Sequence, residues 1–166
     1  MKPGLGTQLR HLIELLDAAV ETSYEQAGLD YRPRYTPVMR ALLAQEPMTI
    51  GEIAAHAGLT QPAATQTVAL MIKEGWLSAT TGTRDGRQKM IALSPTAHEQ
   101  LPRLRACWQA TGAAADDLDA ELPHPLSSTL ASAIDALSDR SFGERIRAAR
   151  AGQAPSGKTA GPNDGD

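Results

Sequence analysis

The sequence predicts a mainly α-helical protein that carries one short β-hairpin. Aliphatic residues recur at helical spacing through most of the chain, and residues that begin and end helices punctuate these stretches. Only 4% of the residues are aromatic, so we expect a core of Leu, Ile, Val, Met and Ala, which favours helices over a β-sandwich. One stretch, from Trp76 to Leu93, changes to the pattern of two strands.

Size and composition indicate a water-soluble chain. The 166 residues fit one compact domain or two small lobes that share helices. No apolar run approaches the roughly 18 residues of a membrane span, and the N-terminus lacks a signal-peptide pattern. The single cysteine, Cys107, cannot form an internal disulfide. We therefore expect a cytoplasmic protein with no membrane partner.

Charge is distributed unevenly along the chain. Between Arg32 and Ser94 there are seven Lys or Arg and four acids, so this part carries a charge of +3. The rest of the chain carries −6, which gives the net charge of −3. A basic lobe on an acidic body is typical of proteins that bind nucleic acid, although a solvated charged face would give the same count.

The N-terminal segment, Thr7 to Ala27, predicts an amphipathic helix that ends at Gly28. The residues from Asp30 to Tyr35 are expected to form a polar link. The helix carries a wide aliphatic stripe that another surface must cover, formed by Leu9, Leu12, Ile13, Leu16, Ala19, Val20 and Tyr24.

Three short helices follow. Thr36 is predicted to cap a helix over Pro37–Gln45, which stops before Pro47. Thr49 and Glu52 have the spacing of a capping box, and the helix they begin should end at Gly58. We expect Leu59 to be buried in the turn. Thr60 should then cap a third helix over Gln61–Glu74, which Gly75 closes.

The C-terminal half returns to helices after the hairpin. Strands are predicted over Trp76–Thr81 and Gln88–Leu93, with the charged segment 82–87 as the tip. Ser94 should begin a long helix toward Leu122, and Pro123 and Pro125 break the chain. A helix with an aliphatic stripe follows, and Ser141 and Glu144 form a second capping box. The last residues, 152–166, have no periodicity and are expected to be disordered.

The order of these elements is informative about function. Two short helices joined by the turn Ala57–Thr60 predict a helix-turn-helix, and a hairpin directly after the second helix predicts a wing. The fold class is therefore a winged helix-turn-helix lobe combined with a helical lobe.

The motifs within this lobe resemble those of the MarR family of transcriptional regulators. They are Met48 to Ala54, Leu59-Thr60-Gln61-Pro62, Lys73 to Leu77, Asp85-Gly86-Arg87 and Ile91 to Ser94. Ser94 stands where the family usually has Thr, and Ala97 where it has Gly.

The resemblance implies a homodimer that binds palindromic double-stranded DNA, usually as a repressor, with a pocket for a small-molecule effector. Residues 33–94 would form the DNA-binding domain, whereas 7–28 and 95–150 would form the dimerisation region. The pocket candidates are His11, Tyr35 and Trp108.

Residue chemistry supports DNA contact by the third short helix and the hairpin. Ala64, Val68, Met71 and Ile72 should face the core, which leaves the polar residues outward. Glutamine amides suit the adenine edge, and arginines at a wing tip suit a narrow minor groove. The bland alternative is a solvated helix and an ordinary charged turn. The predicted DNA-binding residues are Thr60, Gln61, Pro62, Thr65, Gln66, Arg84, Arg87 and Lys89.

Other functions find less support in the sequence. No Gly-rich phosphate loop or nucleophile motif is present, so we expect no enzyme and no cofactor. His11 and Glu14 could seed a metal site but are expected to be exposed polar residues. Cys107 could sense oxidants, although a buried, inert thiol is commoner. A winged-helix module that binds proteins instead of DNA remains the alternative.

Overall fold

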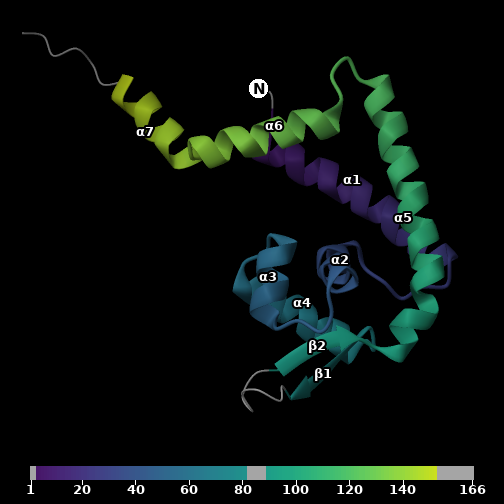
Figure 1. Ribbon diagram of the computed structural model, residues 1–166. Helices are drawn as coiled ribbons and strands as arrows, with labels where there is room; N and C mark the ends of the chain where they lie inside the picture. The colour runs from purple at the N-terminus through teal and green to yellow at the C-terminus, as the bar shows by residue number, and fades with distance from the viewer. Residues whose placement is uncertain (1–2, 82–88, 153–166) are drawn as a thin grey trace, which may run out of the picture. The chain divides into compact units, whose positions relative to one another are not determined.

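The computed structural model describes residues 3–81 and 89–152, which form helices and one hairpin (Figure 1). The chain divides into two compact units, Met1–Ala113 and Ala114–Asp166. The boundary lies within the long helix α5 (Pro95–Glu121). None of the described helices is long and apolar enough to cross a membrane.

Unit 1 contains the predicted winged helix-turn-helix. Its elements before α5 are α1 (Leu5–Gln26), the 3-10 turn η1 (Pro33–Tyr35), α2 (Thr36–Ala44), α3 (Ile50–Ala57), α4 (Gln61–Lys73), β1 (Leu77–Thr81) and β2 (Lys89–Leu93). Helices α2, α3 and α4 gather beside the hairpin, with α3 packed on both α2 and α4 (Figure 1). This arrangement confirms the predicted fold class.

The helix-turn-helix is formed by local signals that the structure confirms. The hydroxyl of Thr49 accepts a hydrogen bond from the Glu52 amide at 3.3 Å, and the Glu52 carboxylate accepts one from the Thr49 amide at 2.7 Å. This capping box begins α3 and lowers the pKa of Glu52 through hydrogen bonds from the Thr49 backbone and side chain. Gly58 ends the helix at φ +65°, a left-handed conformation that favours glycine.

The hairpin is antiparallel, with Leu77 opposite Leu93 and Thr81 opposite Lys89. The backbone of Met48, just before α3, adds a single bridge to Ile91, with N···O distances of 3.0 and 2.8 Å. Ile91 and Leu93 point into the core. The bridge therefore joins the first residues of the helix-turn-helix to the second strand of the wing.

Ser94 joins the chain just after α4 to the start of α5. Its hydroxyl donates to the carbonyl of Gly75 at 2.6 Å and accepts from the amide of Ala97 at 3.0 Å. The first bond holds the residue that follows α4, and the second caps α5, as predicted.

Unit 2 comprises the end of α5, α6 (Leu126–Asp139) and α7 (Phe142–Gly152). The Asp119 carboxylate accepts hydrogen bonds from the Leu126 amide at 2.7 Å and from both the amide and the hydroxyl of Ser127, so it caps α6. The Ser127 hydroxyl is the main cause of the lowered pKa of Asp119. Ser141 and Glu144 form the predicted capping box at α7. Within the described part of unit 2, no side chain is fully buried.

The prediction of a core of Leu, Ile, Val, Met and Ala is confirmed for most buried residues, but it missed the aromatic part of the core. All three tyrosines and both tryptophans lie in one cluster with the aliphatic residues of unit 1, and only Phe142 is exposed. The link before α2 is correspondingly not polar, because Tyr31 and Tyr35 are buried. Large rings bury more apolar area per residue than aliphatic side chains, so a few can complete a small core.

Three smaller expectations also need correction. Thr36 is the first residue of α2 and not its cap, because η1 leads directly into the helix. Leu59 is half-buried in the turn instead of fully buried. Ile72 is 37% exposed, since Ala64, Val68 and Met71 alone form the core stripe of α4.

We predict that Thr49→Ala lowers the free energy of unfolding of unit 1 by about 1 kcal/mol, because the α3 amide loses its side-chain acceptor. Urea unfolding followed by tryptophan fluorescence measures this, since both tryptophans lie in unit 1. An unchanged midpoint would show that the capping box contributes nothing to stability.

Candidate nucleic-acid interface

Helix α4 presents a polar, exposed face opposite its core stripe. Gln61, Pro62, Thr65 and Gln66 are all exposed on its first two turns. Thr60 caps the helix by accepting from the Ala63 amide at 3.4 Å. An exposed polar face is what a helix needs to read bases in a major groove.

The side chains on this face are partly oriented by local bonds. The Thr65 hydroxyl donates to the Gln61 carbonyl at 2.8 Å, which leaves its oxygen as an acceptor. The Gln61 amide group would lie 4.0 Å from a Cβ at Gly51, so it rests beside α3. Gln61 as a whole is nevertheless exposed.

The wing is described only in its strands. Lys89 is exposed at the start of β2, opposite Thr81. Arg84 and Arg87 lie outside the described residues, so their predicted contacts stay predictions.

The far end of α4 carries an ion pair that sequence analysis did not single out. The Glu74 carboxylate accepts from the Arg32 guanidinium at 2.9 Å and from the Tyr35 hydroxyl at 2.6 Å. Glu74 appeared in the sequence only as part of a motif. An acid at a helix C-terminus opposes the helix dipole, and this unfavourable placement is the sequence signal for a cationic partner elsewhere in the chain.

The predicted pocket residues lie in different surroundings. Tyr35 is fully buried. Trp108 is half-buried, donates its indole N–H to the Tyr24 hydroxyl at 3.2 Å, and has the Arg40 guanidinium 5.5 Å from its ring centroid. Both rings contact Tyr31. His11 is exposed on α1, with its Nδ1 atom 3.8 Å from Glu14.

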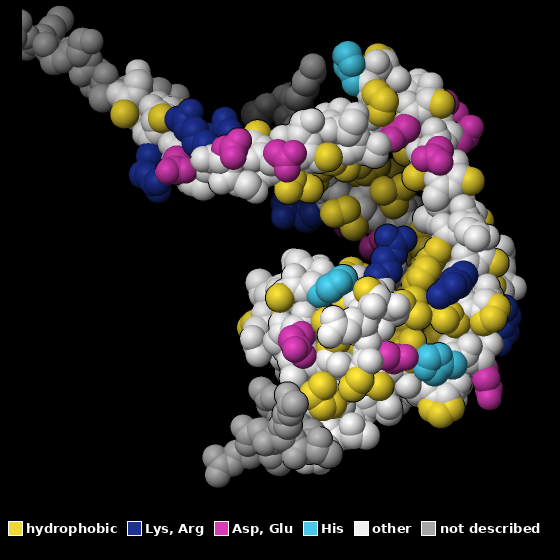
Figure 2. Space-filling view, in the orientation of Figure 1, with side chains coloured by type: hydrophobic (Ala, Val, Ile, Leu, Met, Phe, Trp, Pro, Cys, Tyr) yellow, Lys and Arg dark blue, Asp and Glu magenta, His cyan; other side chains and the backbone are white. Residues whose placement is uncertain are grey.

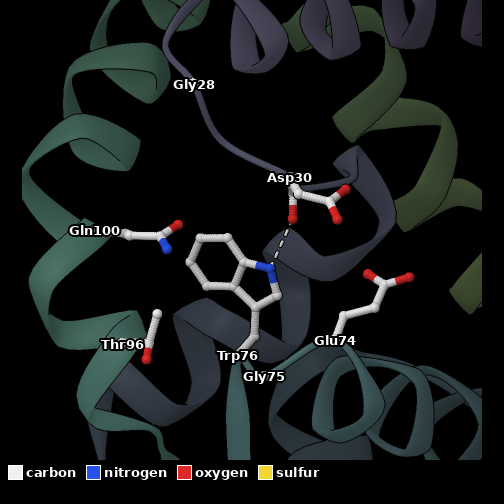
Figure 3. A pocket seen from close by; sticks show the side chains of 7 residues that line it. All are labelled: Gly28, Asp30, Glu74, Gly75, Trp76, Thr96 and Gln100. Carbon is white, nitrogen blue, oxygen red and sulfur yellow. Dashed lines mark hydrogen bonds between the residues drawn. The ribbon is translucent and has the colours of Figure 1, made fainter.

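An open pocket of about 170 Å³ lies beside the end of α4 (Figure 3). The Trp76 indole stands in its centre and donates to the Asp30 carbonyl at 2.8 Å. Residues of α5 lie on one side of the ring, and two acidic residues lie on the other. The lining comprises Gly28, Asp30, Glu74, Gly75, Trp76, Thr96 and Gln100, and none of His11, Tyr35 or Trp108.

The described residues give little support for metal binding or thiol chemistry. Across residues 3–81 and 89–152, no group of three His, Cys, Asp or Glu side chains could hold a metal ion. Cys107 is buried, with its sulfur 3.9 Å from the Ser23 carbonyl.

These features define a winged-helix protein whose exposed recognition helix is available for a nucleic acid. Residues 28–88, which span the winged-helix region, match the model of the MarR family. The resemblance inferred from the motifs is thus confirmed. A comparison with curated protein sequences finds no match.

Solved structures support the fold. The M. tuberculosis transcriptional regulator MOSR in complex with DNA is 18% identical, with a TM-score of 0.63 over 91% of this chain and 99% of its own. The transcriptional repressor CouR bound to a 23-mer DNA duplex is also 18% identical, with a TM-score of 0.62 over 81% of this chain and 92% of its own.

A third similar structure is a complex with a ligand. The PcaV transcriptional regulator from Streptomyces coelicolor, in complex with its natural ligand, is 19% identical. Its TM-score is 0.58 over 84% of this chain and 98% of its own. At these identities the likeness concerns the fold.

We predict that Tyr35 titrates at higher pH in the folded protein than in urea. Burial, and next the hydrogen bond to Glu74, raise its pKa above the ordinary value of about 10. The folded state therefore holds this proton more tightly, and stability should fall as pH rises beyond about 10.

The measurement is tyrosinate absorbance against pH, with and without denaturant, in the wild type and in Tyr35→Phe. The variant should lose part of the difference between the two titrations. Coincident titrations of the folded and unfolded wild type would contradict the buried environment of this ring.

Proposed function

We propose that this protein is a transcriptional regulator that binds double-stranded DNA in a sequence-specific manner. The observation that carries the proposal is the exposed polar face of α4, held by a winged-helix core of the MarR type. The DNA complexes of two proteins with the same fold support it. A regulator of this kind acts by binding, so we expect no catalytic activity, and it acts in the cytoplasm on chromosomal DNA.

The DNA-binding domain of this proposal comprises residues 33–94. Gln61, Thr65 and Gln66 read bases in the major groove, Pro62 lies beside them, and Thr60 with the first amides of α4 contacts a phosphate. The wing contacts the neighbouring groove through Arg84, Arg87 and Lys89.

We further propose a homodimer formed by residues 7–28 and 95–150. Helix α1 exposes Ile13, Leu15 and Leu16, and unit 2 exposes Ile134, Leu137, Phe142 and Ile146. Hydrophobic side chains are visible on the surface of α6 and α7 in Figure 2. Apolar surface of this extent favours association, and a twofold dimer matches a palindromic DNA site.

A small-molecule effector is the remaining part of the proposal, by analogy with the ligand complex of PcaV. The candidate contacts are His11, Tyr35 and Trp108. A compound that releases DNA from the wild type but not from Trp108→Leu would support this location, and equal release from both would contradict it.

We predict that Gln66→Ala and Lys89→Ala affect DNA binding differently. Loss of the Gln66 amide should weaken binding to a selected duplex by about tenfold or more and leave binding to random duplex nearly unchanged. Loss of the Lys89 charge should weaken both and reduce the slope of log affinity against log salt by roughly one per charge removed from a phosphate contact.

The measurement is a salt titration of each variant on a duplex selected from a random pool by the wild type and on random duplex. Arg87→Ala should behave as Lys89→Ala does. If the wild type binds neither duplex in a salt-dependent way, the alternative of a protein-binding winged helix is favoured.

For the dimer, we predict that Ile134→Glu shifts the protein toward monomer, because it places a charge in the apolar face of α6. Ser132→Glu is the matched control, since it adds the same charge about half a turn away on the same helix. Sedimentation at micromolar concentration distinguishes the two. A monomeric wild type, or equal effects of both substitutions, would refute an interface on this face.

A further inference from the structure

The end of α4 is tied to the link before α2 by a single carboxylate. Glu74 directs one oxygen to the Arg32 guanidinium at 2.9 Å and the other to the Tyr35 hydroxyl at 2.6 Å. Its side chain is 15% exposed, against 44% for that of Arg32. Hydrogen bonds to a charged and largely desolvated group are the stronger and more directional kind.

The position is unfavourable for an acid in the absence of these partners. Glu74 is the residue at the C-terminal cap of α4, where the partial negative charge of the helix end repels a carboxylate. A Lys or Arg would suit the site better on local grounds. Glu74 is held there by two partners more than 35 residues away in sequence. Its position therefore serves tertiary contacts and does not cap the helix.

The residues after Glu74 are also held by directional bonds. The carbonyl of Gly75 accepts from the Ser94 hydroxyl at 2.6 Å, and the Trp76 indole donates to the Asp30 carbonyl at 2.8 Å. Three consecutive residues thus fix the end of α4 to the link and to the start of α5. Figure 3 shows Glu74, Trp76 and Asp30 close together at this junction.

The rest of α4 is held mainly by apolar contacts of Ala64, Val68 and Met71. Such contacts are not directional and tolerate small rotations of a helix. Over the 13 residues of α4, about 20 Å at 1.5 Å per residue, a tilt of about 6° displaces the far end by about 2 Å. A displacement of that size breaks a base contact made by Gln61, which lies at the far end.

We propose that Glu74 is a positioning residue for DNA reading: its bonds to Arg32 and Tyr35 fix the direction of α4 so that its polar face meets the bases in register. This inference rests on the proposed function. It assigns specificity to a residue that lies at the opposite end of α4 from the predicted base contacts.

The test compares Tyr35→Phe and Glu74→Gln with Tyr31→Phe as the matched control. Tyr31 is a buried tyrosine of the same aromatic cluster whose hydroxyl donates to Thr36 at 3.5 Å and makes no bond to α4. Each variant is titrated with a duplex selected from a random pool by the wild type and with random duplex, below the onset of thermal unfolding. The readout is the ratio of the two affinities.

Tyr35→Phe and Glu74→Gln should each lower this ratio by about fivefold or more, with random-duplex affinity within about twofold of wild type. Tyr31→Phe should keep the wild-type ratio. The double variant Tyr35→Phe/Glu74→Gln should lose less than the sum of the two single effects, because Glu74→Gln removes the charge and one acceptor oxygen of the same contact from which Tyr35→Phe removes the hydroxyl.

A wild-type ratio in folded Tyr35→Phe and Glu74→Gln would overturn the inference, since the bonds would then contribute to stability alone. If Glu74→Gln fails to fold, Tyr35→Phe decides by itself, because it removes only a hydroxyl. A wild type without preference for any duplex would instead refute the proposed function, and this result is seen before any variant is made.

Discussion

Tyr31 is the side chain on which the packing of unit 1 depends. Its ring makes edge-to-face contacts with Tyr24 at 5.0 Å and Trp76 at 4.9 Å between centroids, and with Tyr35 and Trp108 at 5.6 and 6.4 Å. These four rings belong to α1, the residue before β1, η1 and α5. A residue in the link between two helices therefore joins α1, η1 and α5 with the residue that leads into the hairpin. Edge-to-face pairs add roughly 0.5–1.5 kcal/mol each beyond the area they bury.

The polar atoms at the edge of this cluster extend its influence to the candidate interface. The Tyr35 hydroxyl reaches Glu74, the Trp76 indole reaches the Asp30 carbonyl, and Trp108 reaches Tyr24. A buried ring with a satisfied polar atom has one preferred orientation, because rotation would leave that atom without a partner. The aromatic cluster thus fixes the end of α4 as well as the core, and the orientation of the exposed polar face of α4 depends on both.

Sequence reasoning succeeded where structure is determined by neighbours along the chain. The capping boxes at Thr49 and Ser141, the glycine ends at Gly58 and Gly75, and the alternation of the hairpin are local, and each is confirmed. Prediction from the sequence failed where contacts between residues far apart in the chain determine the packing. Low aromatic content suggested an aliphatic core, but composition does not reveal that five rings meet in space. The polar face of α4 could be predicted from helical spacing, whereas the Arg32–Glu74–Tyr35 contact could not, because its members are separated by about 40 residues.

The bridge between Met48 and Ile91 has a consequence for how the wing can vary. Side chains alternate along β2, so a slip of one residue would turn Ile91 and Leu93 out of the core, and the bridge opposes such a slip. Lengthening or shortening the hairpin by one residue in each strand would preserve the core residues near the bridge. Each such step changes the reach of the strands by about 3.3 Å. The length of this appendage can therefore change in fixed increments while the lobe that carries it stays the same.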